Sequence, residues 1–206
     1  MTVEEVVRLK NLVTETDHAS GPEHAPVTLL EYGNFECLDC GRIFPIIREV
    51  RKRFGDNLRF VFRHFPTVKT HPHAMRAAEA AEAAAAQGKF WQMHDELFSH
   101  QKFLADQSLV RYAGRIGLDL ERFNADLREN VWLRQIEEQY RSALFDEHIT
   151  GTPTLYLNEI RYTGLTDLQS MLAAIKEADG TGQMNLPDTS RGLRRVLRSF
   201  KSDAGK

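Results

Sequence analysis

Cysteine is scarce in this chain, since Cys37 and Cys40 are the only two among 206 residues. Two cysteines at positions i and i+3 cannot join distant segments into a disulfide framework, and a domain of this length does not need one. No second cysteine pair is present to complete a four-thiolate zinc site. The pair therefore indicates redox chemistry, metal binding with histidine ligands, or two inert buried thiols.

Long apolar runs and a strong charge bias are absent too. No stretch approaches the roughly 18 to 20 consecutive apolar residues of a membrane span. Charged side chains occur within residues 1–10, where a signal peptide would be apolar, so we expect a cytoplasmic protein with no membrane span. The formal net charge of -2 gives no overall attraction to nucleic acid, and we expect no nucleic-acid partner.

Composition divides the chain into three parts. Residues 1–24 are polar and acidic, and we expect them to form a leader segment before the core. Residues 25–179 hold the predicted domain, and residues 180–206 hold a linker and a basic tail. In the tail, four apolar side chains at i, i+3, i+4 and i+7 predict a short basic amphipathic helix: Leu193, Val196, Leu197 and Phe200. We expect this helix to dock on its own domain or on a second subunit, with a membrane surface or nucleic acid as the alternative.

The cysteine pair lies where a predicted strand gives way to a predicted helix. Residues 26–32 are β-branched and apolar, as in a buried strand, and apolar residues recur at helical spacing over residues 43–54. A second strand is predicted over residues 58–65. The three segments form a strand-helix-strand unit with both cysteines at the carboxyl end of its first strand.

The remaining elements complete an α/β domain. Residues 71–149 are alanine-rich at first and helical in pattern throughout, which predicts an all-helical insertion of four or five helices. Residues 154–163 have the pattern of a β-hairpin around Asn158-Glu159, and residues 165–178 that of a closing helix.

A helix amino terminus makes a cysteine reactive. Its free amides and positive dipole end stabilise a thiolate, which is the nucleophilic form of cysteine. Cys37 would be activated there, and Cys40, one turn further on, could resolve a mixed disulfide by attacking the sulfur of Cys37. This chemistry needs no cofactor.

Zinc binding is the main alternative, with two further ligands from histidine. His71 and His73 are the first candidates, followed by the more distant His64, His94, His100 and His148. Because a histidine pair around a proline is more simply the start of a helix, we predict no metal site.

Several motifs resemble those of the bacterial DsbA-like thioredoxin-fold oxidoreductases, which carry a helical insertion in the thioredoxin fold. The matching segments lie at residues 25–37 (APVTLLEYGNFEC), 63–66 (RHFP), 71–74 (HPHA), 87–91 (QGKFW), 93–95 (MHD) and 151–154 (GTPT). The resemblance implies a thioredoxin-like fold with an all-helical insertion between the βαβ unit and the ββα unit.

The resemblance also implies roles for particular residues. Cys37 would be the nucleophile, Cys40 the resolving cysteine and Pro45 the proline inside the active-site helix. A proline at the start of a strand is ordinarily trans, but the resemblance implies that Pro153 is a cis proline. A cis bond there would leave the backbone of Thr152 free to pair with an extended peptide. Phe35 would be an apolar contact for substrate, with core packing as the alternative.

The residues between the cysteines depart from the family, where proline followed by histidine or an aromatic residue is common. Leu38-Asp39 stands there instead, and the Asp39 carboxylate disfavours a nearby thiolate. We therefore expect a reductase or isomerase rather than a strong oxidant, with a potential nearer roughly -270 mV than roughly -120 mV. A solvated, screened Asp39 with little effect is the alternative.

The sequence thus predicts a thiol-disulfide oxidoreductase whose partners are protein thiols and disulfides. A redox-sensing regulatory or binding module on the same fold is the first alternative. A glutathione-dependent transferase or isomerase is the second.

Overall fold

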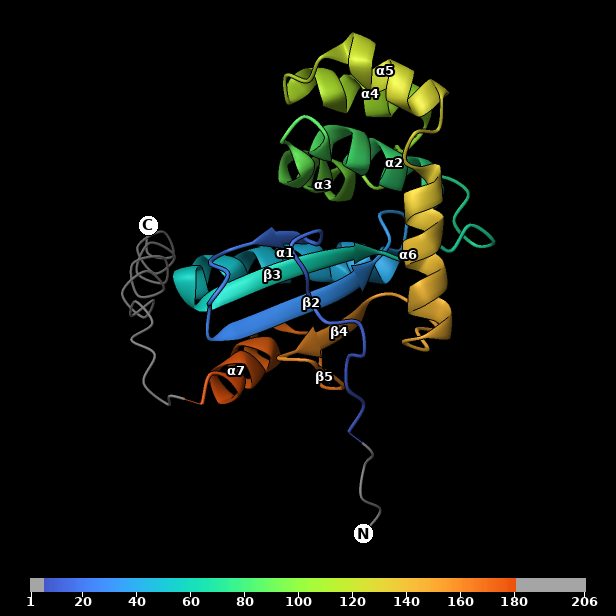
Figure 1. Cartoon of the computed structure of the whole chain (residues 1–206). Coiled ribbons are helices and arrows are strands. Elements are labelled where there is room, and N and C mark those ends of the chain that lie inside the picture. Colours follow the sequence, from blue (N-terminus) through green and yellow to red (C-terminus); the bar gives the residue numbers. More distant parts are fainter. Residues whose placement is uncertain (1–5, 181–206) are drawn as a thin grey trace, which may run out of the picture.

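The computed structural model describes residues 6–180, which form a mixed α/β domain around a five-stranded sheet (Figure 1). The strand order is β1-β3-β2-β4-β5, and β2 and β3 are parallel while the other neighbours are antiparallel. The strands are β1 (His18–Ser20), β2 (Val27–Gly33), β3 (Leu58–His64), β4 (Thr154–Leu157) and β5 (Ile160–Arg161).

The predicted strand-helix-strand unit is present at the centre of this sheet. Helix α1 (Leu38–Phe54) connects β2 to β3, with Pro45 inside it and a short 3-10 turn (Gly55–Asn57) after it. Gly55 adopts a φ of 51°, a left-handed conformation that glycine tolerates at a helix end. Cys37 and Cys40 consequently lie at the carboxyl end of the central strand β2.

The insertion between β3 and β4 contains five helices, as the periodicity indicated. They are α2 (Ala74–Ala85), α3 (Phe90–Ser99), α4 (Asp106–Arg115), α5 (Leu120–Arg128) and α6 (Leu133–Phe145). Helices α2 to α5 form a group beside the sheet, and α6 runs from that group back towards β4 (Figure 1). Seven of the eight alanines of α2 are buried, and their small side chains let neighbouring helices approach closely. A thioredoxin-like α/β fold with a helical insertion is therefore confirmed.

The two faces of the sheet belong to two separate apolar clusters. Side chains alternate along a strand, so Val27 and Leu29 of β2 enter one cluster and Leu30 and Tyr32 the other. The larger cluster joins the sheet to α1, the insertion and α7 (Leu168–Ala178). The smaller one packs under α6 and the N-terminal segment, where Leu9 is buried.

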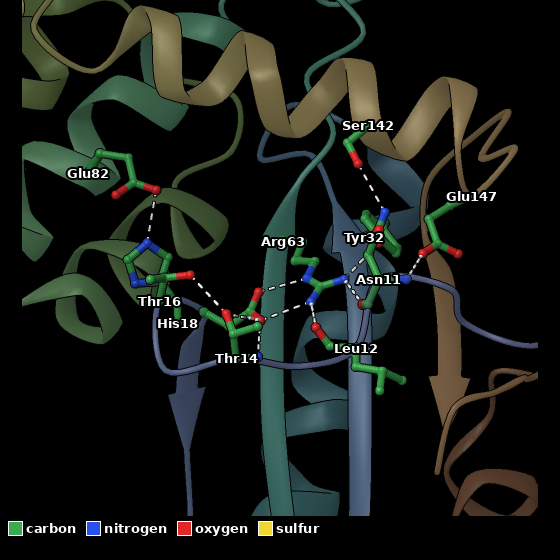
Figure 2. Close-up of polar contacts among 11 residues, drawn as sticks. Asn11, Leu12, Thr14, Thr16, His18, Tyr32, Arg63, Glu82, Ser142 and Glu147 are labelled. Atoms are coloured by element: carbon green, nitrogen blue, oxygen red, sulfur yellow. Dashed lines mark hydrogen bonds and ion pairs between the residues drawn. The ribbon is translucent and has the colours of Figure 1, made fainter.

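The expectation that residues 1–24 only precede the core is wrong for the part of that segment that is described. His18–Ser20 pairs with β3 as an antiparallel edge strand. Arg63 of β3 forms an ion pair with Asp17 at 2.7 Å. Arg63 also donates to the carbonyl oxygen of Asn11 (Figure 2). Buried Glu147 accepts hydrogen bonds from the backbone amides of Lys10 and Asn11. These distant polar contacts, which a polar composition does not reveal, hold the segment on the sheet.

The C-terminal elements of the domain follow the prediction closely. The turn at Asn158 and Glu159 has positive φ at both residues, as a two-residue hairpin requires. Asp167 caps α7 by accepting hydrogen bonds from the amides of Gln169 and Ser170. The expected amphipathic helix in the basic tail lies outside the described residues. Within residues 6–180, no helix is long and apolar enough to cross a membrane.

Candidate active site

The turn after β2 places Cys37 at the start of α1. Cys37 is the N-cap residue of the helix, with an extended backbone at φ -73° and ψ 123°. The Asn34 side chain accepts a hydrogen bond from the amide of Glu36 at 2.9 Å, and the Asn34 carbonyl accepts one from the amide of Cys37 at 3.1 Å. This compact turn directs the Cys37 sulfur to the amino end of the helix, where exposed amides favour an anion.

The two thiols are free, and their environments differ strongly. Cys37 is 7% exposed and Cys40 is fully buried. A hydrogen bond with Cys40 lowers the pKa of Cys37 to about 5 against the opposing effect of burial, aided by Thr152 and by the amides of Cys40 and Asp39. Burial and the hydrogen bond to Cys37 raise the pKa of Cys40 well above its usual value. One sulfur is thus prepared to attack and the other remains a thiol.

The segment before β4 faces the cysteine pair. The Thr152–Pro153 peptide bond is cis, as the resemblance implied. The Cys37 sulfur lies 3.2 Å from the carbonyl oxygen of Thr152, which places this backbone directly beside the nucleophile. Thr152 and Pro153 are both partly exposed, so a bound peptide could reach them.

A groove of about 540 Å³ opens beside Cys37. Its lining is largely apolar and includes Val68, His71, Tyr140 and Thr152. A peptide that presents a disulfide to Cys37 would find space there for its neighbouring side chains.

Sequence reasoning missed Glu31, a buried carboxyl group behind the thiols. Glu31 lies on β2, is 2% exposed, and its Oε1 atom has no hydrogen-bond partner among the described residues. Burial raises the pKa of Glu31 to about 8; a hydrogen bond with Cys40 opposes this shift and the charge of Cys37 adds to it. An acid within an otherwise apolar strand was the available signal, because such a residue is rarely buried without a function.

Sequence reasoning also missed Gln101, which follows α3 and reaches back to the active-site helix. Its amide nitrogen donates to the carbonyl oxygen of Cys37 at 2.6 Å. A β-carbon at Gly41 would lie 2.2 Å from Oε1 of Gln101, so the glycine leaves space for this side chain. A contact across 64 residues of sequence leaves no local signal.

Asp39 and Phe35, the other two predicted site residues, differ in their exposure to solvent. Asp39 is exposed and forms an ion pair with Arg42 at 2.6 Å, which partly compensates its charge. Phe35 is 1% exposed, and in the core its ring stacks on Phe62 and lies tilted against Phe98. The expected contact of Phe35 with substrate is therefore corrected to core packing, because the turn directs its ring under the insertion.

The zinc alternative at the cysteine pair has no support in the geometry. Among the described residues, no two histidines approach Cys37 and Cys40 closely enough to complete a metal site. The site residues brought together are Cys37, Cys40, Thr152 and Pro153, with Glu31 and Gln101 in addition.

Comparisons with known proteins agree with this architecture. BdbD from Bacillus subtilis, in its oxidised form, is 22% identical with a TM-score of 0.70, over 80% of this chain and 93% of that one. The thiol-disulfide exchange protein alpha-DsbA2 from Wolbachia pipientis is 24% identical with a TM-score of 0.68, over 79% and 87% of the two chains. At these identities the similarity shows the fold.

Relatives with higher sequence identity are much longer proteins. Na(+)/H(+) antiporter NhaA 1 from Salinispora arenicola is 41% identical over 92% of this chain, and NhaA 1 from Mycolicibacterium gilvum is 42% identical over 84%. The chain spans only 29% and 28% of their respective lengths. The sequence model of the family described as Thioredoxin matches residues 13–177, from the N-terminal segment to α7. The chain therefore belongs to the thioredoxin family.

Proposed function

We propose that this protein exchanges disulfides with protein substrates through Cys37 and Cys40. The observation that carries the proposal is the position of Cys37, which caps α1 beside the partly exposed residue Thr152 with Cys40 buried behind it. A reactive thiolate, a resolving thiol and a peptide-binding backbone are what thiol-disulfide exchange requires.

The reaction proceeds through a mixed disulfide. The Cys37 thiolate attacks one sulfur of a substrate disulfide, so that a new S–S bond forms, the substrate S–S bond breaks and one substrate thiolate leaves. Cys40 then loses its proton and attacks the sulfur of Cys37, which releases the second substrate thiolate. The substrate gains two electrons, and the pair ends as a disulfide; the reverse sequence oxidises a dithiol.

Glu31 is suited to receive the proton of Cys40. Its carboxyl group hydrogen bonds with Cys40, and the negative charge of Cys37 is one of the causes that raise its pKa. When Cys37 enters the mixed disulfide, that charge disappears and the carboxyl group becomes easier to ionise. The base thus becomes available at the step that needs it.

The preferred direction is reduction or isomerisation. Hydrogen bonds stabilise the Cys37 thiolate, which favours the reduced state and raises the potential, while the exposed Asp39 in the first turn of α1 lowers the potential by a small amount. The two opposing effects favour a potential between that of a thioredoxin and that of a strong oxidant. We expect a potential between roughly -270 mV and roughly -160 mV. A redox titration against glutathione that gives a value above about -160 mV would contradict this direction.

An assay of both half-reactions tests the proposed chemistry. With dithiothreitol as the reductant the parent protein should reduce insulin over many turnovers, and with glutathione disulfide as the oxidant it should oxidise reduced ribonuclease over many turnovers. Cys37→Ser should abolish both activities, and Cys40→Ser should accumulate mixed disulfides with substrate. Activity that survives in Cys37→Ser would end the proposal.

A second candidate is a redox-sensing module that seldom turns over. The observation in its favour is the occurrence of related sequences within proteins named Na(+)/H(+) antiporters, where such a domain would stay near one target. This function predicts a single stoichiometric exchange per chain in the same assays, even with excess reductant. Repeated turnover would favour the enzyme.

A further inference from the structure

Three potential metal ligands converge at a second place, where the edge strand β1 meets β3 and α2. They are His18 on β1, His64 at the end of β3 and Glu82 on α2. The Nε2 atoms of His18 and His64 lie 2.9 Å and 3.0 Å from the same Oε1 atom of Glu82 (Figure 2 shows the His18 contact). The three ligand atoms all lie within 4.8 Å of one another.

From this convergence we propose that His18, His64 and Glu82 bind a divalent transition-metal ion such as Zn²⁺. Two imidazole nitrogens and one carboxylate oxygen are ligands that zinc commonly takes, with water in the fourth position. Tetrahedral zinc with bonds of about 2.1 Å needs ligand atoms roughly 3.4 Å apart, so each histidine nitrogen would move about half an ångström away from Oε1 of Glu82 to admit the ion.

The charge of Glu82 supports a cation at this position. The Glu82 side chain is 2% exposed, and no lysine or arginine among the described residues forms an ion pair with it. A buried carboxylate is normally paired with a cation or coordinates a metal. A divalent ion bound by the two imidazoles and Glu82 would supply that cation.

The surroundings hold the ligands in place and leave one side accessible. The His18 ring stacks on Phe90 with ring centroids 3.5 Å apart, and His64 contacts Phe62 edge-on. The His18 side chain is 18% exposed whereas that of His64 is 2% exposed, so an ion could arrive from the His18 side. An apolar shell around fixed imidazoles is typical of metal sites.

The competing interpretation is a hydrogen-bonded triad in which both imidazoles donate from Nε2 to Glu82. The two interpretations differ in whether Nε2 carries a proton, because a metal requires Nε2 of both rings to be deprotonated. They also differ for Glu82→Gln, whose side-chain carbonyl oxygen could still accept both hydrogen bonds but lacks the charge that a metal site needs. This variant therefore separates the two.

Zinc binding should be measured by equilibrium dialysis on untagged protein with Cys37→Ser and Cys40→Ser, because thiolates would compete for the ion. This double cysteine variant should bind one Zn²⁺ per chain, and the bound ion should raise its Tm. Zinc binding should weaken as the pH falls. Adding Glu82→Gln or His18→Asn should abolish the bound zinc and the rise in Tm. His24→Ala, at an exposed histidine outside the cluster, should change neither.

Two outcomes would overturn the metal site. One is that the double cysteine variant binds no Zn²⁺. The other is that Glu82→Gln and His18→Asn leave both the zinc stoichiometry and the rise in Tm unchanged. His18→Asn lies at a partly exposed position, so it tests the site even where Glu82→Gln impairs folding. The thiols are absent throughout, so the result is independent of the exchange activity.

Discussion

The side-chain amide of Gln101 donates to the carbonyl oxygen of Cys37, and the missing side chain of Gly41 is what makes this contact possible. The loop after α3 thereby holds the end of the helix that carries the nucleophile. The helical insertion is thus linked directly to the active site and not only through its apolar core.

A double-mutant cycle tests this link. Replacing a helical glycine by alanine usually stabilises a protein by about 0.5–1 kcal/mol. Gly41→Ala should also break the Gln101 hydrogen bond, and this loss should offset the gain in stability. Once Gln101→Ala is present, the same substitution should stabilise the protein. We expect the two effects to differ by about 1 kcal/mol in chemical denaturation of the reduced protein. Equal effects of Gly41→Ala in both backgrounds would show that the contact is not formed.

Glu31→Gln should slow the second half of the reaction. The neutral amide of this variant could no longer accept the Cys40 proton, so the mixed disulfide should persist at least about tenfold longer, whereas its formation by Cys37 should be little affected. Quenched-flow trapping with a fluorescent peptide disulfide separates these two rates. Glu79→Gln, at a buried glutamate on α2, is the matched control and should leave both rates unchanged. Equal resolution rates in parent and Glu31→Gln would remove Glu31 from the mechanism.

Stability should depend on pH through Glu31 with an unusual sign. Because its pKa rises from 4.5 to about 8 on folding, the folded state holds a proton that the unfolded state has lost between these values. Glu31 therefore costs increasing stability as the pH rises from about 4.5 to about 8, by at most about 5 kcal/mol. Glu31→Gln should be more stable than the parent, with a difference that is larger at pH 8 than at pH 5. A difference independent of pH would show that Glu31 ionises normally.

Cys37 should react as a thiolate down to mildly acidic pH. Its pKa of about 5 predicts that alkylation by iodoacetamide stays fast at pH 7 and falls to half its maximum near pH 5. Cys40→Ala removes the first of the hydrogen bonds that lower this pKa, so the midpoint should move to higher pH. A midpoint near the ordinary cysteine value in the parent protein would show that the helix end does not activate the thiol.

The sequence predicts this site unevenly, and the reason is the range of each interaction. Cys37 and Cys40 could be assigned because their chemistry depends on local spacing and on a strand-to-helix junction. Pro153 required the resemblance, since a proline at a strand start is ordinarily trans. The residues around Glu31 predict a strand, but this pattern does not show that the Glu31 side chain is buried. Its burial depends on how α1 packs over β2.

The N-terminal segment shows the same limit for the fold. Three residues of mixed polarity, His18–Ser20, carry no strand signal of their own. They pair with β3 because Arg63 and Glu147 bind the preceding chain, contacts that cross 46 to 137 positions of sequence. Such contacts are visible only in three dimensions.

The residues between the cysteines should tune the redox potential by a small, salt-dependent amount. Asp39→Asn removes a negative charge near the Cys37 thiolate, which stabilises the reduced state and should raise the potential. Arg42→Gln leaves the Asp39 charge uncompensated and should lower it. Both side chains are well exposed, so we expect shifts below about 30 mV that vanish towards 1 M salt, where screening acts within roughly 3 Å. Glutathione titrations at low and high salt measure them. A larger shift that persists in salt would mean that Asp39 couples to the thiolate as a buried charge, and a fall in potential for Asp39→Asn would reverse the assigned sign.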